Sequence, residues 1–357
     1  MTDRKINFNQ SGHKMLHHLD RVQAWLRGER VVPVHIELGT GPRCNFNCIF
    51  CFTAFQKADA CSLDRKTFLK IMRDAAEAGV RSIGILGDGE PTLNPALAEA
   101  VAFGHGLGLD IGLATNGLLF DDRLARSILP HLVWVRFTTC AATPETFEAV
   151  HRIPAKHFET VRRNVSGAVA AKKEMGLSVT IGMQMVLVPE NIGETVEASR
   201  QARDLGADYF SAKQASISPH NAYRFDLDFY DKYEGLLAEV EAESTDEFAS
   251  IVAWEKLRSK GKKEYHRCYG YQMLFQVTGK GEVYPCSELV GREDFLIGDF
   301  RRETLKDMIY GKRYEEVMRA MEGKLDLEKD CATCCRHDAI NKFLWTLKNP
   351  PDHINFI

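Results

Sequence analysis

The stretch VPVHIELGTGPRCNFNCIFC, residues 32–51, joins an apolar run to three closely spaced cysteines. Residues 32–38 are typical of a β-strand, and Cys44, Cys48 and Cys51 follow in the loop after it. Three such thiolates can ligate three irons of a 4Fe–4S cube and leave one iron open. A zinc loop is the alternative, but it needs a fourth ligand, and Cys61 lies ten residues on without a matching spacing.

Five more apolar runs follow and alternate with helical patterns, at residues 82–86, 110–115, 133–139, 178–187 and 208–214. Residues 65–78 carry apolar side chains at helical spacing, with Asp64 as a predicted N-cap and Gly79 as a stop. This alternation predicts an α/β fold with a parallel sheet curved into a partial (β/α)6 TIM-like barrel. Active sites of such barrels lie in the loops that follow the strands, which is where the three cysteines stand.

The pattern changes after residue 214. Residues 225–243, 247–259, 304–321 and 335–347 are predicted as helices, 259–263 as a linker, and 274–285 as a hairpin with Gly279-Lys-Gly281 at its turn. We therefore predict an N-terminal helical extension (1–31), a barrel with its following helices (32–259) and a small C-terminal domain with its tail (260–357).

Composition restricts the possible functions. The 357 residues are 45% apolar and carry a formal net charge of −3, which gives no general case for nucleic acid or an anionic membrane as a partner. No run approaches the length of a transmembrane helix, and the polar N-terminus lacks a signal peptide. We expect a cytoplasmic protein, in which ten cysteines indicate metal binding or catalysis rather than disulfides.

A second cysteine group lies near the C-terminus, with Cys268, Cys286, Cys331 and Cys334 as a predicted set of four ligands. Four thiolates on a hairpin and at a helix start can hold a complete 4Fe–4S cluster, although four thiolates suit zinc too. Cys335 is then surplus, either as an inert thiol or as the ligand in place of Cys334.

The chain resembles the radical S-adenosylmethionine (SAM) superfamily. Its first cysteines follow that family's Cys-x3-Cys-x2-Cys signature, with the aromatic Phe50 before the last. Gly87-Asp-Gly-Glu-Pro91 stands where the family carries Gly-Gly-Glu-Pro, with Asp88 replacing a glycine, and Thr115-Asn-Gly117 resembles its Thr-Asn-Gly. The resemblance implies a set of SAM-binding residues: Glu90, Pro91, Asn116, Gly117, Thr138 and Arg152.

The resemblance also implies a chemistry. In that family the open iron binds the amino and carboxylate groups of SAM, and an electron, from a donor such as flavodoxin or ferredoxin, cleaves SAM to a 5′-deoxyadenosyl radical that takes hydrogen from the substrate. The C-terminal cysteines resemble the "twitch" half of a SPASM domain, which holds one auxiliary 4Fe–4S cluster. Their spacing is similar to that of the dehydrogenases of 2-deoxy-scyllo-inosamine, which oxidise a secondary alcohol.

Alternation along residues 133–139 places Trp134, Arg136, Thr138 and then Cys140 on the inner face of the barrel. Cys140 is therefore a candidate hydrogen-atom donor, although a small buried thiol is the plainer interpretation. Three functions stay open: a dehydrogenase acting on a small polyol, amino sugar or nucleotide sugar; an epimerase using Cys140; and a ribosomal-peptide maturase. The last is disfavoured, since 31 residues before the first strand are too few for a peptide-binding domain.

Overall fold

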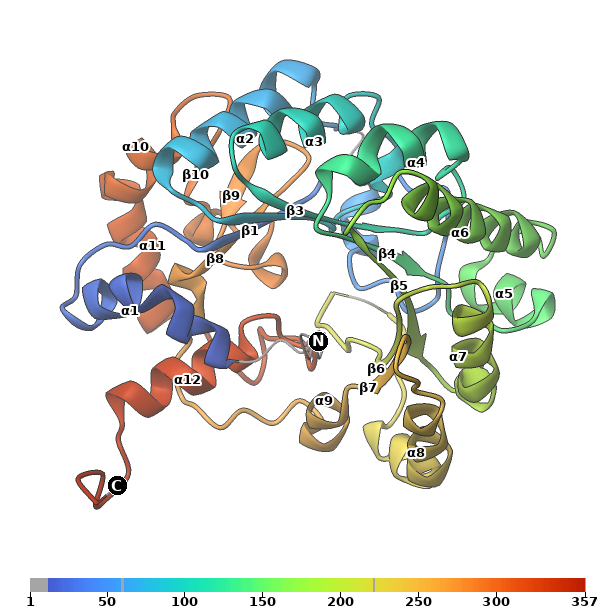
Figure 1. Cartoon of the computed structure of the whole chain (residues 1–357). Helices are drawn as coiled ribbons and strands as arrows, with labels where there is room; N and C mark the ends of the chain where they lie inside the picture. The colour runs from blue at the N-terminus through green and yellow to red at the C-terminus, as the bar shows by residue number, and fades with distance from the viewer. Residues whose placement is uncertain (1–11, 59–60, 221, 357) are drawn as a thin grey trace.

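The computed structural model describes residues 12–58, 61–220 and 222–356, so residues 1–11 of the predicted extension lie outside the described residues. Its core is a curved sheet of ten strands in the order β10-β9-β8-β1-β2-β3-β4-β5-β6-β7, with most helices on its outer side (Figure 1). All neighbouring strands from β8 through β1 to β7 pair in parallel. The predicted α/β fold with a partial barrel is confirmed.

The strands are β1 (His35–Leu38), β2 (Ser82–Ile85), β3 (Asp110–Thr115), β4 (Trp134–Thr138), β5 (Thr180–Leu187), β6 (Tyr209–Gln214), β7 (Ala249–Val252), β8 (Leu274–Val277), β9 (Glu282–Tyr284) and β10 (Gly298–Asp299). The helices are α1 (Leu19–Leu26), α2 (Arg65–Ala78), α3 (Leu97–Gly106), α4 (Asp122–Ile128), α5 (Pro144–His151), α6 (His157–Glu174), α7 (Thr195–Asp204), α8 (Glu234–Ala242), α9 (Trp254–Ser259), α10 (Leu305–Tyr310), α11 (Lys312–Gly323) and α12 (Asp338–Lys348). None of the helices within the described ranges is long and apolar enough to cross a membrane.

Local sequence signals account for α2. The side chain of Asp64 accepts a hydrogen bond from the backbone N–H of Thr67 at 2.9 Å, which caps the first turn. Gly79 ends the helix in the left-handed conformation, with φ of 96°. The helix buries Phe68, Ile71 and neighbouring apolar side chains on one face, so the predicted bounds of 65–78 are confirmed.

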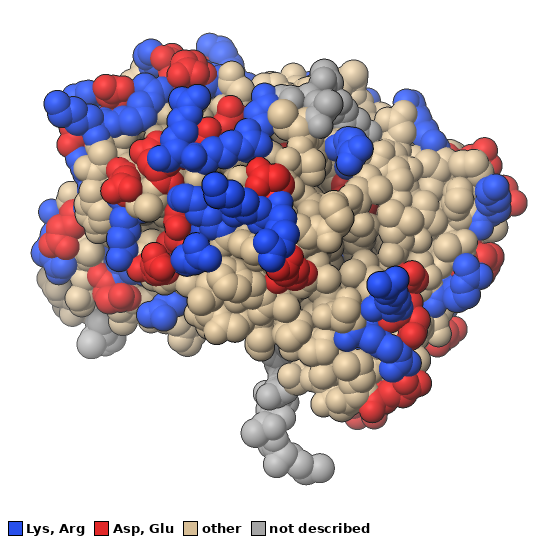
Figure 2. Space-filling model, turned by 90° about the horizontal axis from the view of Figure 1, so that it is seen from above, with Lys and Arg blue, Asp and Glu red and all other residues tan. Residues whose placement is uncertain are grey.

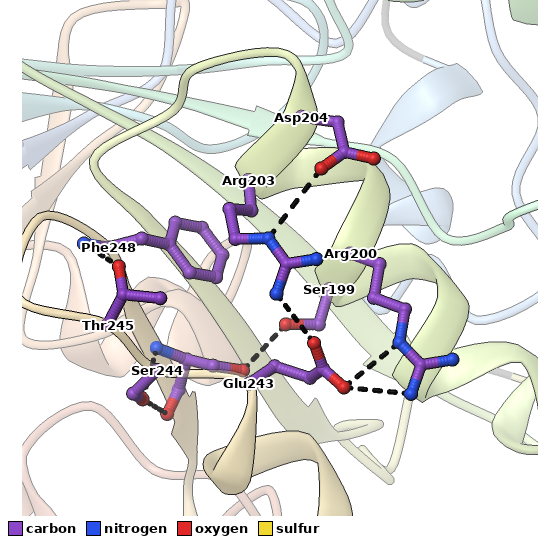
Figure 3. A network of polar contacts seen from close by, with 9 residues as sticks. Ser199, Arg200, Arg203, Asp204, Glu243, Ser244, Thr245 and Phe248 are labelled. Atoms are coloured by element: carbon purple, nitrogen blue, oxygen red, sulfur yellow. Dashed lines mark hydrogen bonds and ion pairs between the residues drawn. The ribbon is translucent and has the colours of Figure 1, made fainter.

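The helix predicted over residues 247–259 is wrong in its first half. Residues 249–252 form strand β7, which pairs in parallel with β6, and only α9 is helical. The reason is tertiary: Ser250 on β7 shares a 2.7 Å hydrogen bond with Ser199 on α7, and Glu243 at the end of α8 accepts from Arg200 and Arg203 (Figure 3). These contacts from α7 and α8 hold the short strand on the sheet.

The predicted C-terminal hairpin is present as β8 and β9, with Gly281 at φ 82° in its turn. Strand β8 also pairs in parallel with β1, and His35 lies opposite Leu274. The cysteine-bearing C-terminal segment therefore extends the barrel sheet next to the strand that precedes the first cysteine loop. The boundary at residue 260 stays a prediction.

Two aromatic rings pack against glycines of neighbouring strands. The indole of Trp134 packs on Gly112 of the neighbouring strand, and the ring of Tyr209 packs on Gly182. A Cβ atom at either glycine would collide with the ring, so glycine is required there by close approach. The guanidinium of Arg136 lies over the Trp134 ring, 5.5 Å from its centroid, and Arg136 lines the cavity inside the barrel.

Candidate active site

A cavity of about 570 Å³ occupies the inside of the barrel. Side chains from both cysteine groups line it: Cys48, Cys51, Cys286, Cys331, Cys334 and Cys335. The strands add Arg136 and Thr138 from β4, Gln184 from β5, and Lys213 from β6. The predicted inward face of β4 is therefore correct for residues 136 and 138, and one chamber is lined by cysteines of both groups.

The first cysteine loop is tied to the end of β3. Asn116 donates its Nδ2 hydrogens to Asn45 Oδ1 at 2.6 Å and, at 3.9 Å, toward Cys44 Sγ. The other amide of this pair, Asn45 Nδ2, is buried and has no hydrogen-bond partner within the described residues. A buried, unpaired donor beside Cys44 is a place where an acceptor group of a bound ligand fits.

His151, which the sequence analysis did not single out, contacts the same loop. Its Nε2 accepts the backbone N–H of Cys140 at 3.0 Å, so the ring proton resides on Nδ1. Nδ1 lies 3.0 Å from Cys48 Sγ and therefore donates to it. Burial lowers the pKa of His151 to about 3, so the ring is neutral at physiological pH. The sequence shows only that His151 stands at the end of a helix, now α5. That position does not indicate which loop its side chain contacts.

Glu90 is the centre of a hydrogen-bond network rather than an open ligand. Its Oε1 accepts from Thr92 and from the Thr115 hydroxyl at 2.6 Å, and its Oε2 accepts from the Asn116 N–H at 2.8 Å. Burial raises the pKa of Glu90, and these hydrogen bonds oppose that shift. Oε2 holds a single protein partner and has room for one more donor.

The other predicted SAM-binding residues are distributed unevenly. Pro91 starts a short 3-10 turn beside Glu90. Gly117 adopts φ 81°, and a side chain at this position would also press on Phe137. Thr138 lines the cavity. Arg152 is exposed, adopts a left-handed conformation and ends α5 through a 2.8 Å bond to Glu148 O. Of these four residues, Thr138 lines the cavity, Pro91 and Gly117 are buried beside Glu90 and Asn116 in the turns after β2 and β3, and Arg152 is exposed.

Cys140 does not line the cavity. Its side chain is fully buried in the apolar core, and its Sγ accepts the backbone N–H of Val186 at 3.2 Å. Burial raises the pKa of its thiol to about 12. Strand β4 ends at Thr138, so the alternation of faces does not extend to position 140. The geometry supports the plainer interpretation, a buried structural thiol.

The second cysteine group has an unexpected membership. Burial raises the pKa of Cys286, and the charges of Cys331, Cys335 and Cys268 raise it further. Burial also opposes ionisation of Cys335, but hydrogen bonding to His337 brings its pKa below the usual value. Cys334, which lines the same cavity, has its Sγ 3.6 Å from Gln214 O and 3.9 Å from Ala215 O.

The thiols are nevertheless spread widely. Within residues 12–58, 61–220 and 222–356, no three His, Cys, Asp or Glu side chains lie as close together as the ligands of a single metal ion. The donor sets that remain are thiol-rich, as iron–sulfur clusters require, and each surrounds or borders the cavity. The residues present therefore fit two such clusters in composition and position.

Comparisons with known proteins agree with this geometry. The model of the radical SAM superfamily matches residues 38–202, and that of the SPASM iron–sulfur cluster-binding domain matches residues 268–335. The two matches imply 4Fe–4S clusters at the two cysteine groups and confirm the auxiliary domain expected from the sequence.

Curated relatives are similar over about half of the chain. A cofactor-modifying protein of tungsten-containing aldehyde ferredoxin oxidoreductase from Pyrococcus furiosus is 26% identical over 46% of this chain and 47% of its own length. A probable GTP 3′,8-cyclase from Saccharolobus islandicus is 28% identical over 53% of this chain and 56% of its own. The chain spans about half the length of the curated relatives it matches.

Solved structures share the fold over most of the chain. SuiB from Streptococcus suis, bound to its precursor peptide SuiA, aligns with a TM-score of 0.66 at 17% identity, covering 93% of this chain and 79% of SuiB. The enzyme anSMEcpe with bound AdoMet aligns with a TM-score of 0.59 at 16% identity, covering 88% of this chain and 95% of its own. At these identities the likeness establishes the fold alone.

Proposed function

Because the chain is a radical SAM enzyme with a C-terminal iron–sulfur cluster-binding domain, we propose that it abstracts hydrogen from a small polyol, amino sugar or nucleotide sugar and oxidises an alcohol to a ketone. A cavity lined by cysteines of both groups, with hydroxyl and amide side chains among its lining residues, is the observation that supports this proposal. Hydroxyl and amide side chains of Thr138, Gln184, Ser211 and Gln214 line it and suit a substrate rich in hydroxyl groups.

Cys44, Cys48 and Cys51 would hold the cluster whose chemistry is the reductive cleavage of bound SAM. Around it, Asn116 holds Asn45 and Cys44 in place, and His151 donates to Cys48. Glu90 orders the turns that follow β2 and β3 and keeps one carboxylate position open for the SAM ammonium group. Pro91, Gly117 and Thr138 complete the proposed SAM site. Arg152, exposed at the end of α5, would reach it only if its side chain moved.

The auxiliary cluster is assigned to Cys268, Cys286 and Cys331, together with Cys335. The mutual electrostatic effects of these four thiols and the hydrogen bonding of Cys335 to His337 support Cys335 as the fourth ligand. The sequence spacing had favoured Cys334, whose thiol instead faces backbone carbonyls of β6 and the residue after it.

Oxidation is favoured over epimerisation by the position of Cys140. An epimerase returns a hydrogen atom to the substrate, and a thiol that does so must reach the cavity. Cys140 is fully buried and is not among the residues that line the cavity. The peptide-maturase alternative is suggested by SuiB, which binds a precursor peptide, but the likeness to SuiB extends to the fold alone.

The proposal is tested with anaerobically reconstituted protein, reduced by dithionite or by a flavodoxin or ferredoxin system, in the presence of SAM. Formation of 5′-deoxyadenosine is expected in the wild type and is abolished when Cys44, Cys48 and Cys51 are replaced by Ala together. Candidate polyols, amino sugars and nucleotide sugars are then screened for stimulated 5′-deoxyadenosine formation and a carbonyl product. A peptide product, or stimulation by peptides alone, would refute the small-molecule proposal.

A further inference from the structure

Cationic side chains gather inside the barrel. Arg136 on β4 and Lys213 on β6 line the cavity, together with Lys256 on α9 and Arg336 just before α12. On the face of the molecule in Figure 2, by contrast, Lys and Arg lie interspersed with Asp and Glu. The interior group is therefore a local excess of positive charge in a chain whose net charge is −3.

The carboxylates that line the cavity do not pair with Arg136 or Lys213. Glu37 pairs with Arg336 at 3.0 Å. Asp88 accepts from the N–H groups of Gly41 and Gly279, Glu288 accepts from the Ser218 hydroxyl, and Glu241 accepts from the Val252 N–H. Among the residues that the structure describes, neither Arg136 nor Lys213 forms an ion pair with a carboxylate, although Glu255 also borders the cavity.

Unused hydrogen-bonding groups lie beside these cations. Arg136 Nε is buried and has no hydrogen-bond partner within the described residues. Gln214, next to Lys213 on β6, is fully buried and is among the residues at the cavity. Its amide oxygen and its amide nitrogen have no hydrogen-bond partner within the described residues. Buried polar groups are nearly always paired, and buried charges are costly unless an opposite charge is near. A bound anion with hydrogen-bonding groups of its own would satisfy these residues.

We propose that the substrate carries an anionic group, a phosphate or a carboxylate, which binds between Arg136 and Lys213 inside the barrel. This inference rests on the proposed function and names its substrate class. Arg136 offers a planar set of donors and Lys213 a point charge from the neighbouring side of β5, while Gln184 and Gln214 hydrogen-bond the polar body of the substrate. Phosphorylated or acidic sugars and polyols fit this description, and neutral ones leave the cations unpaired.

The probes for the test are inorganic phosphate and acetate, each titrated into SAM-loaded holoenzyme and followed by the NMR line width of the anion. Saturable binding in the millimolar range is expected, and the anion that binds more tightly identifies the group on the substrate. Lys213→Met should weaken that binding at least about tenfold, as the loss of a charge-assisted hydrogen bond does. Lys213→Arg should retain it, and Lys232→Met, at an exposed lysine outside the cavity, should leave it unchanged.

Two results would overturn the proposal. Absence of saturable binding of both anions, or binding that Lys213→Met does not weaken, shows that the cavity cations hold no anion. Binding that occurs without SAM but is lost when SAM is present assigns the cations to the carboxylate of SAM itself. Formation of 5′-deoxyadenosine is measured on the same samples: its absence in the wild type refutes the proposed function, whereas its presence without anion binding refutes this inference alone.

Discussion

Replacing Cys334 or Cys335 by Ala separates two assignments of the auxiliary cluster that differ by one position in the chain. Adjacent residues point in different directions, and we propose Cys335 rather than Cys334 as the ligand beside Cys268, Cys286 and Cys331. Two four-iron clusters predict about eight irons per chain. Cys334→Ala should therefore keep about eight irons, while Cys335→Ala should fall toward about four.

The measurement is sharper in a background without the first cluster. With Cys44, Cys48 and Cys51 replaced by Ala, the auxiliary site is the remaining one, so iron should be about four per chain. Adding Cys334→Ala should leave that value, and adding Cys335→Ala should bring it close to zero, as measured by iron and sulfide analysis and by EPR after reduction. Thermal unfolding of each apoprotein checks that the alanine variants fold. Loss of iron in the Cys334 variant with retention in the Cys335 variant would refute Cys335 as the fourth ligand and support Cys334, the ligand predicted from the sequence.

Three further predictions follow from the first cysteine loop and its surroundings. Glu90→Ala should weaken SAM binding at least about tenfold in equilibrium titration, since it removes an acceptor for the ammonium group and loosens Asn116; unchanged affinity would contradict the assignment. His151→Phe removes the N–H donated to Cys48 and should lower the midpoint potential of that cluster by roughly 20–60 mV in an EPR-monitored titration, because the bond favours the more negative, reduced state. Cys140→Ala should keep near-normal turnover and a carbonyl product in deuterium oxide; a deuterium-labelled isomer that disappears in this variant would instead establish the epimerase.

Much of the barrel could be predicted from the sequence because its signals are local. Strands of alternating or continuous apolar residues, and the Asp64 cap and Gly79 stop of α2, depend on neighbours along the chain. Strand β7 could not be predicted in the same way. Its four residues are too few to show a period, and its stability comes from β6 and from Ser199 on α7.

The candidate site likewise contains residues that local motifs predict and residues that they do not. The cysteine loop and the turns after β2 and β3 carry dense motifs, so their residues were identified by pattern. His151 was not, because its role depends on where the end of α5 meets the loop of Cys48. Cys140 was placed on the wrong side because the alternation of β4 was extended past Thr138, where the strand ends.

The pairing of β8 with β1 explains why the two cysteine groups share one chamber. The loop that carries Cys44 to Cys51 leaves β1, and the hairpin that leads to Cys286 begins at β8, the strand beside it. The turn between β8 and β9 lies at the edge of the sheet where the first cysteine loop leaves β1, and Gly279 in this turn donates to Asp88. Strand β9 then runs antiparallel, back toward the start of β8, and Cys286 follows it. Cys286 and Cys331 line the same cavity as Cys48 and Cys51, whereas Cys140 is buried in the apolar core and is not among the lining residues. Under the proposed function, a substrate in this cavity would lie beside ligands of a second redox centre, as the proposed oxidation requires.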